Sequence, residues 1–241
     1  MLKKFLKSFP VFENLRRGLN NQYERDDFVI GELRKLPGRS KILDAGCGSQ
    51  RYRQYCGHLV YKAQDFGKYT KDEKPGFVSA DQAAESAYSY GTLDYVGDIW
   101  QIAEKDESFD AILCTEVLEH IPFPIETIRE FRRLLWPGGT LILTAPSNCL
   151  RHMDPYFFYT GFSDRWFEKM LADNAFSIER LDAVGDYYRW LAVEAARTAA
   201  ANTLFAKILL APAFLYFYNK ARTDVSTDTL CMGYHVLARR K

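Results

Sequence analysis

The sequence predicts an α/β fold in which a mostly parallel sheet is covered by helices on both faces. Short apolar runs bounded by glycine, proline or acidic residues alternate with segments that have the apolar spacing of helices. Strands buried on both faces are apolar throughout and are joined by crossover helices, and this alternation is typical of that arrangement. The chain has 241 residues, 47% of them hydrophobic, which is enough for one domain with a full core.

The elements of the first half follow from their boundaries. A first helical segment ends at Pro37-Gly38, a strong breaker, and a buried strand then leads into Gly46-Cys-Gly48. Trp136-Pro-Gly-Gly139 ends another helical segment before a further buried strand. The connection over 67–91 is rich in glycine, lysine and serine and is expected to be irregular. We expect helices over 20–36, 51–57 and 124–135. We expect a first strand that starts at Lys41, and four further strands over 59–64, 93–96, 111–115 and 140–145.

The C-terminal third departs from this alternation. A helix is predicted over 163–174 and a strand over 177–181. One long helical stretch follows over 192–220, and we expect it to break at Pro212. The last strand is expected over 231–237. We interpret the long stretch as a helical hairpin inserted before that strand.

The turn Gly46-Cys-Gly48 is the strongest functional signal in the chain. Glycine has no Cβ, so it can take a positive φ and let a ligand approach the main chain closely. Open α/β sheets bind ligands outside the carboxyl ends of their strands, which is where this turn lies. We therefore expect a cofactor site at the turn.

Acidic residues at the ends of the next strands indicate which cofactor it is. Asp65 can accept both hydroxyls of a ribose, and Asp98 can accept from the N6 amine of adenine. Phe66 and Ile99, which follow them, are candidates to sandwich the adenine ring. Arg51 stands where a dinucleotide motif has its third glycine, and the sequence contains no Gly-Lys-Ser/Thr phosphate loop. Carboxylates repel phosphates but suit S-adenosylmethionine, which carries a sulfonium and an ammonium group.

At these motifs the chain resembles the class I S-adenosylmethionine-dependent methyltransferases of the small type 11 group. The resemblance covers about residues 38–150, with the motifs in the family's order. A narrower likeness, over 151–163, is to a bacterial subgroup often associated with modifying cell-surface sugars. The matching segments are Leu43–Gly48, Asp65, Gly97-Asp98-Ile99, Ser108–Ile121 and Leu135–Leu141.

The resemblance implies a Rossmann-like, seven-stranded sheet in a single domain over 1–241, with a C-terminal helical insertion before the last strand. We expect five regions: a helical cap over 1–37, a cofactor-binding core over 38–150, a substrate-side region over 151–191, the insertion over 192–222 and the final strand over 228–241.

The resemblance also implies roles for residues at the strand ends. Gly46 and Gly48 contact the methionine part through their backbones, and Glu116 lines the sulfonium side. Asp44 supports the loop or faces the ammonium group, and the alternative is that it caps amides of the turn. The expected cofactor-binding residues are Asp44, Ala45, Gly46, Gly48, Asp65, Phe66, Asp98, Ile99 and Glu116.

Two histidines are candidates for the base that deprotonates an alcohol acceptor. His120 and His152 follow the fourth and fifth predicted strands, whose ends face the methyl group in this family. For His120, the alternative is a hydrogen bond to the backbone at the start of the loop over 121–124. Tyr156 and Tyr159 are candidates for a substrate-binding wall.

A metal is a further alternative at the same place. Glu116-x-x-Glu119-His120 resembles the metal motif of methyltransferases that act on RNA 3′ ends and on some quinone precursors. The RNA enzymes supply another histidine, and its counterpart here is Pro155. We therefore expect no metal.

The remaining features bound partners and location. The chain has 32 basic and 31 acidic residues, so nucleic acid is not expected as a partner. Its five cysteines lack zinc-ligand spacing, which fits a reduced, cytoplasmic setting. The amphipathic segment Met1–Phe9 and the apolar segment 204–218 are candidates for peripheral membrane contact. The second is shorter than the ~20 residues that a spanning helix needs, and a lid or a homo-oligomer surface is the alternative.

The expected function is S-adenosylmethionine-dependent methyl transfer to a small molecule or glycan, at oxygen. The alternatives are a nicotinamide-dependent oxidoreductase and a non-catalytic cofactor-binding scaffold. No residue pattern identifies the acceptor.

Overall fold

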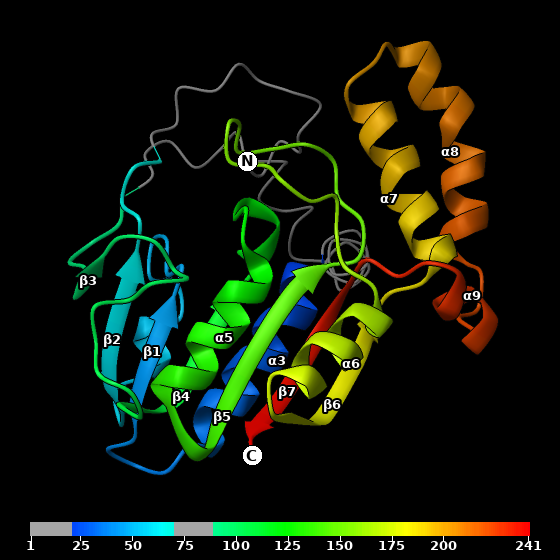
Figure 1. The fold of residues 1–241 in the computed structure, drawn as a ribbon. Coiled ribbons are helices and arrows are strands. Elements are labelled where there is room, and N and C mark those ends of the chain that lie inside the picture. The colour runs from blue at the N-terminus through cyan, green and yellow to red at the C-terminus, as the bar shows by residue number, and fades with distance from the viewer. Residues whose placement is uncertain (1–20, 70–88) are drawn as a thin grey trace. The chain divides into compact units, whose positions relative to one another are not determined.

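The protein is built on a seven-stranded sheet with the strand order β3-β2-β1-β4-β5-β7-β6 (Figure 1). The computed structural model describes residues 21–69 and 89–241. Parallel pairs join β1 to β2 and β4, β2 to β3, and β4 to β5, whereas β7 is antiparallel to β5. The predicted fold class is thereby confirmed. The strands are β1 Lys41–Ala45, β2 Val60–Asp65, β3 Tyr95–Val96, β4 Phe109–Thr115, β5 Leu135–Pro146, β6 Phe176–Val184 and β7 Gly233–Arg240.

The chain divides into two units. One comprises residues 28–182 and 233–241 and carries most of the sheet, and the other contains residues 183–232 with the described residues before Phe28. The predictions for Met1–Phe9, and for most of the connection over 67–91, concern residues outside the described ranges.

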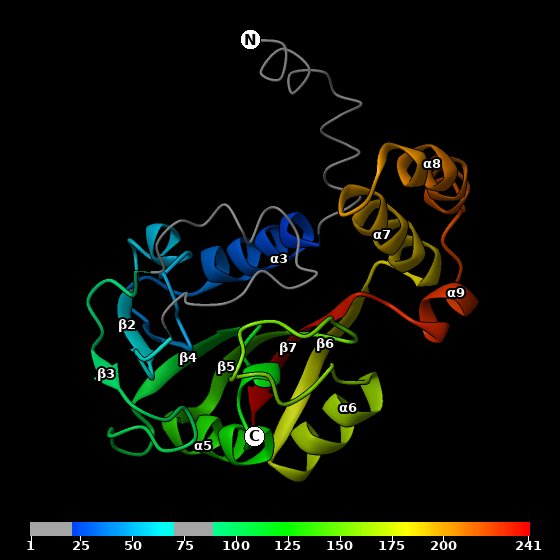
Figure 2. The ribbon, with the colours of Figure 1, turned by 90° about the horizontal axis from the view of Figure 1, so that it is seen from above.

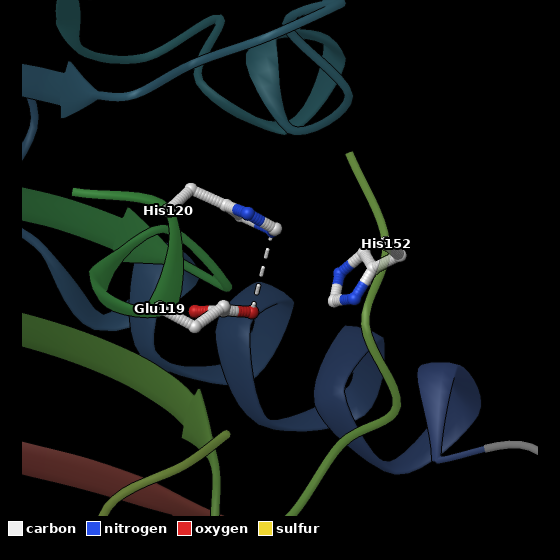
Figure 3. A group of neighbouring side chains, drawn as sticks. All are labelled: Glu119, His120 and His152. Atoms are coloured by element: carbon white, nitrogen blue, oxygen red, sulfur yellow. Dashed lines mark ion pairs between the residues drawn. The ribbon is translucent and has the colours of Figure 1, made fainter. Parts of the chain in front are cut away.

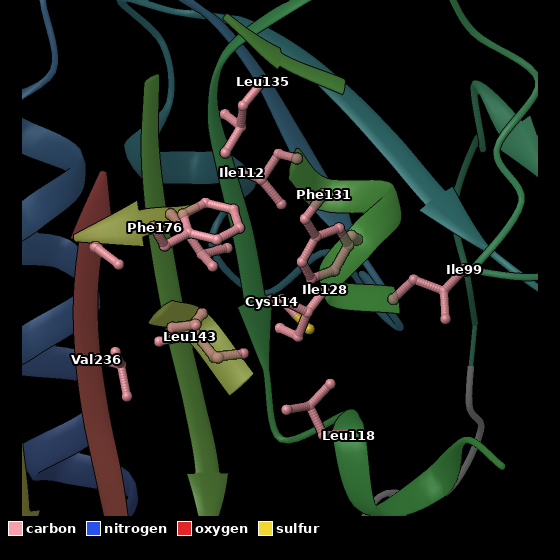
Figure 4. Packing of buried hydrophobic residues seen from close by; sticks show 14 of the residues in the cluster. Ile99, Ile112, Cys114, Leu118, Ile128, Phe131, Leu135, Leu143, Phe176 and Val236 are labelled. Carbon is pink, nitrogen blue, oxygen red and sulfur yellow. The ribbon is translucent and has the colours of Figure 1, made fainter. Parts of the chain in front are cut away.

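Helices cover both faces of the sheet. The helix α3 (Gln22–Lys35) lies on one face, and α5 (Pro124–Leu134) and α6 (Asp164–Asp173) lie on the other (Figure 2). Two buried clusters fill the space between them. Leu43 of β1 belongs to the cluster with α5 and α6, shown in Figure 4, and its neighbour Ile42 belongs to the cluster with α3. Successive strand residues point to opposite faces, so an all-apolar strand is the expected result.

The strand order predicts a ligand site beside β1. The chain proceeds from β1 outward through β2 and β3, and then returns to the other side of β1 with β4 and β5. Ligands bind in open α/β sheets outside the carboxyl ends of the strands where this direction reverses. The loops after β1 and β4 therefore bound the expected site.

Several sequence predictions of local structure were wrong. The helix over 51–57 is only the 3₁₀ turn Arg53–Tyr55, and β5 extends back through the predicted turn to Leu135, which pairs with Phe109 of β4. The long helical stretch forms two helices, α7 (Tyr187–Ala200) and α8 (Leu204–Tyr218), and a short helix, α9 (Asp224–Thr229), was not predicted.

The break between α7 and α8 has a local cause. It falls before Thr203 rather than at Pro212, which lies inside α8. The Thr203 hydroxyl accepts a hydrogen bond from the Ala206 amide at 3.4 Å and so satisfies a free donor at the start of α8. Pro212 removes one N–H donor, while the residues on either side of it remain helical.

Candidate cofactor and acceptor site

The glycine turn after β1 has the backbone that the sequence predicts. Gly46 has a φ of +71° and Gly48 a φ of +50°. The Gly46 amide donates to the Gln64 carbonyl oxygen at 2.9 Å, and the Gly48 amide donates to Oδ2 of Asp65, also at 2.9 Å. A Cβ at Gly46 would lie 2.6 Å from Cγ2 of Val117. The turn is therefore held between the end of β2 and the residues that follow β4.

We expect Gly46→Ala to lower the free energy of unfolding by about 1–3 kcal/mol, because it adds both backbone strain and a steric clash. Adding Val117→Ala to the Gly46→Ala protein should remove the steric clash and restore that part of the stability, while the backbone strain remains. Gly57→Ala is the control, since a Cβ there has no neighbour within 4 Å. Urea unfolding of wild type and the three variants measures both contributions. A Gly46→Ala protein as stable as wild type would contradict the close packing at this turn.

Asp65 ties the glycine turn to the loop after β2. Its carboxylate is buried, and it accepts from the Gly48 amide at 2.9 Å and from the Gly67 amide at 3.1 Å. Burial raises the pKa of Asp65, and the backbone hydrogen bonds oppose that shift. Each carboxylate oxygen has more than one acceptor position, so ribose hydroxyls can still bind here. The ribose role stays a prediction.

Asp44 has a side-chain partner that sequence reasoning missed. It is 2% exposed, and its Oδ2 accepts a hydrogen bond from the Tyr61 hydroxyl of β2 at 2.6 Å. Burial, with a smaller contribution from the charge of Asp65, raises the pKa of Asp44 to about 7, although the Tyr61 hydrogen bond lowers it. The carboxyl group therefore changes charge near neutral pH.

A raised pKa means that the folded protein binds this proton more tightly than the unfolded chain does. The contribution of Asp44 to stability is complete below pH 3.8 and is lost as the pH rises through about 7. We expect Asp44→Asn to remove this loss, so that its free energy of unfolding falls less than that of wild type between pH 5.5 and 8. The whole shift of about three units corresponds to at most ~4 kcal/mol, of which about 2 kcal/mol falls between pH 5.5 and 8.

Urea unfolding at both pH values checks this prediction. The neighbouring thiols of Cys47 and Cys56 have raised pKa values and stay neutral throughout the window. Asp94→Asn is the control, because the Asp94 pKa is lowered and its carboxylate is ionised at both pH values. Equal pH dependence in wild type and Asp44→Asn would refute the assignment.

The three predicted adenine contacts lie in different surroundings. Ile99 is buried in the cluster under α5, where Figure 4 shows it, and Asp98 is exposed. The Phe66 ring meets the Tyr156 ring edge-on, with centroids 4.8 Å apart. Phe66, predicted for the cofactor, is therefore adjacent to Tyr156, predicted for the acceptor. The adenine sandwich stays a prediction, and Ala45 offers only its backbone because its side chain is in the core.

Glu116 occupies a strained position after β4. Its φ is +52°, which is rare for a residue with a side chain and typical of functional sites. Its Oε1 accepts from the Thr144 hydroxyl at 2.9 Å, and its amide donates to the Thr144 carbonyl oxygen at 3.0 Å. These bonds to β5 hold Glu116 at the carboxyl end of the sheet.

Both predicted catalytic histidines lie in one cluster with Glu119 (Figure 3). The ring centroids of His120 and His152 are 4.6 Å apart, and Nε2 of His120 lies 3.7 Å from Oε1 of the buried Glu119. Nδ1 of His120 is 2.7 Å from the Tyr156 carbonyl oxygen, and Nδ1 of His152 is 2.8 Å from that of Leu150. A carbonyl only accepts, so each Nδ1 carries a proton, and in the neutral form of either imidazole Nε2 is the nitrogen with the lone pair.

The environment keeps His120 neutral. Burial, with a smaller contribution from the charge of His152, lowers the pKa of His120 to about 4. His120 does contact a backbone carbonyl, but it is that of Tyr156 and not one at the start of the loop over 121–124, and the contact leaves Nε2 available. The structure brings the His152 imidazole beside His120, a neighbour that the sequence comparison with the metal motif did not provide. The ligand atoms of Glu119, His120 and His152 lie within 4.8 Å of one another.

The loop over 156–159 is attached to this cluster. The amides of Phe158 and Tyr159 both donate to the Glu119 carbonyl oxygen, at 2.9 and 3.2 Å. The Tyr159 hydroxyl donates to the Pro122 carbonyl oxygen at 3.2 Å, so its polar end is already used within the fold. Phe157 lies against both imidazoles, with centroids 5.5 Å from His152 and 6.4 Å from His120. Phe157 therefore places its ring beside the histidines, whereas Tyr156 contacts His120 through its carbonyl oxygen and directs its ring toward Phe66.

Comparison with known proteins decides the family. Residues 19–183, more than half of the chain, match the family described as "Methyltransferase domain". The chain belongs to this family. It is a class I S-adenosylmethionine-dependent methyltransferase, and S-adenosylmethionine is its cofactor. The site fits that group, since the Asp65 carboxylate at the end of β2 lies beside the glycine turn and could accept hydrogen bonds from the hydroxyls of a ribose.

Curated relatives match part of this methyltransferase. The ubiquinone biosynthesis O-methyltransferase of Xanthomonas campestris strain B100 is 36% identical over 124 residues, which are 50% of this chain and 48% of the relative. The protein of that name from Xanthomonas oryzae strain PXO99A is 55% identical over 124 residues, which are again 50% of this chain and 48% of the relative. The one from Vibrio vulnificus strain YJ016 is 30% identical over 137 residues, 56% of this chain and 54% of the relative. The chain thus spans about half the length of these relatives.

Solved structures agree on the fold. The [4+2]-cyclase SpnF has a TM-score of 0.54 at 19% identity and covers 88% of this chain and 78% of its own. A structure from Galdieria sulphuraria that is named as a sarcosine dimethylglycine methyltransferase has a TM-score of 0.53 at 14% identity. The match covers 94% of this chain and 86% of that one. Identities this low show the fold alone. Across the described residues, no helix is both long and apolar enough to cross a bilayer.

Proposed function

We propose that this methyltransferase methylates an oxygen atom of a small molecule or glycan. The observation that carries the proposal is the cluster of two imidazoles and a buried carboxylate after β4 and β5. A hydroxyl must lose its proton to become a good nucleophile, and a positioned base typically contributes 10²–10⁴-fold to such a step. Two Nε2 lone pairs at one place, with both tautomers held by backbone carbonyls, supply that base.

The residues of the chain have separate tasks in this mechanism. S-adenosylmethionine supplies a methyl group already activated by the sulfonium. His152, helped by His120, takes the acceptor proton at Nε2. The Glu119 carboxylate, buried beside them, stabilises the imidazolium that forms. Tyr156 and Phe157 exclude water and align the acceptor for in-line attack.

A divalent cation is the second mechanism that the geometry supports. Glu119, His120 and His152 form a donor set of one carboxylate and two imidazoles, and each imidazole donates its other N–H to a carbonyl, as metal-ligating histidines usually do. Such an ion would lower the pKa of a bound hydroxyl. The expectation of no metal stays a prediction, and the support for this second mechanism is the His152 imidazole that lies beside His120.

Transfer of a labelled methyl group tests the proposal. The acceptor panel contains nucleotide sugars, lipid-linked glycans and phenols, the last because the matched relatives are named for O-methylation in ubiquinone biosynthesis. We expect label in an ether of a hydroxyl-bearing acceptor, and none with His152→Ala. Label found only in amines would refute transfer to oxygen.

A further inference from the structure

The helix α8 is apolar on two opposite sides. Its half-buried positions recur at helical spacing and belong to the side that packs on α7, namely Ala206, Leu210, Ala213, Phe214, Phe217 and Tyr218. The opposite side forms what we call the outer stripe, made of Leu204, Phe205, Ile208, Leu209, Leu215 and Tyr216. Each outer-stripe residue is between 55% and 73% exposed, and none of the 15 residues of α8 is buried.

This stripe is unusual for a helix of a protein in water. A helix that is apolar all round is normally buried in a protein core or in a membrane, and large contiguous exposed apolar patches mark interaction sites. Figures 1 and 2 show α7 and α8 lying side by side as a hairpin, so α7 accounts for one side of α8. The outer stripe needs another partner.

Charge indicates the chemistry of that partner. Residues 187–222, which contain the hairpin, carry five basic residues and one acidic residue, a net charge of +4 in a chain whose whole net charge is +1. Arg197 is paired with the single acid, Glu194, at 2.8 Å. Lys207 lies within α8 and is exposed, and Lys220 follows its end. A second copy would bring two hairpins of the same sign together, whereas an anionic surface complements them.

The end of the hairpin has the composition of a membrane interface. The Lys220 ammonium lies 4.6 Å from the centroid of the Tyr216 ring and 5.9 Å from that of Tyr188. Tyrosines are enriched where a polar headgroup layer meets hydrocarbon, and lysines extend their charge toward the headgroups.

We propose that the outer stripe of α8 lies in the surface of an anionic lipid bilayer. At ~1.5 Å per residue, the 15 residues of α8 extend about 22 Å, less than the ~30 Å of a hydrocarbon core. The helix therefore lies in the plane of the interface, with its apolar side among the acyl chains and Lys207 and Lys220 at the phosphates. This proposal is independent of the methyl acceptor.

Vesicle flotation with the full chain tests the proposal. The vesicles are phosphatidylcholine alone, or phosphatidylcholine with about one third phosphatidylglycerol. We expect binding to the anionic vesicles that falls about 100-fold in the double variant Phe205→Ser with Leu209→Ser, because both side chains leave the interface. The double variant Lys207→Glu with Lys220→Glu should lose at least about tenfold. Val225→Ser is the matched control, since Val225 is 77% exposed on α9, outside the hairpin.

Each variant is also titrated with S-adenosylhomocysteine, and unchanged affinity shows that the sheet unit is folded. Equal binding to neutral and anionic vesicles, or no binding to either, would overturn the proposal. So would a dimer in sedimentation equilibrium that the Phe205→Ser, Leu209→Ser variant dissociates, because the stripe would then bind a second copy.

Discussion

Asp65→Ala should weaken binding of S-adenosylhomocysteine by at least about 100-fold. The carboxylate holds the Gly48 and Gly67 amides at 2.9 and 3.1 Å and is the predicted acceptor for both ribose hydroxyls. Hydrogen bonds to a charged group contribute about 1.5–3 kcal/mol each, so losing two accounts for the effect. Isothermal titration calorimetry measures the affinity.

A cofactor analogue separates the two roles of Asp65. The analogue 2′,3′-dideoxy-S-adenosylhomocysteine has no ribose hydroxyls. For this analogue, Asp65→Ala should lower the affinity only by the part that comes from the altered glycine turn. Asp94→Ala is the control for loss of an acid nearby, because Asp94 pairs with Lys62 at 2.7 Å and has no predicted ligand role. Unchanged affinity in a folded Asp65→Ala protein would refute the ribose assignment.

The second large effect concerns the histidine cluster. We expect His152→Ala to lower kcat by about 10²–10⁴-fold while affinity for S-adenosylhomocysteine stays unchanged, because the base acts on the acceptor and not on the cofactor. Glu119→Gln should also lower kcat, since it removes the charge that stabilises an imidazolium but keeps the backbone carbonyl that holds Phe158 and Tyr159. His58→Ala is the control, because His58 is exposed and precedes β2, away from the carboxyl ends of the strands.

Chelation distinguishes the base from the cation at the same cluster. With a histidine base, EDTA leaves kcat unchanged, and this is the result that we expect. Loss of activity that Mg²⁺, Mn²⁺ or Zn²⁺ restores in wild type, but not in Glu119→Gln, would assign a bound cation instead. Wild-type turnover in His152→Ala would contradict both mechanisms.

Much of the cofactor side could be predicted from sequence because its signals are local. Gly46 and Gly48 need positive φ, and their spacing after an apolar run is visible in nine consecutive residues. Asp65 is the last residue of β2, so its place at the carboxyl end of the sheet required only the parallel topology. Helix ends were less predictable. The α7–α8 break depends on a single cap at Thr203, which competes with a proline nine residues later.

By itself, the sequence determined the fold class, the family and the cofactor, since these depend on strand periodicity and on motifs within short segments. Only the tertiary structure decided which side chains meet. It pairs Asp44 with Tyr61 across two strands, brings His152 to His120 from 32 positions away, and buries Glu119 beside them. Such contacts depend on strand order and on the path of the loop over 147–163, and no local propensity encodes either. The acceptor side is therefore a property of the packed sheet and its loops.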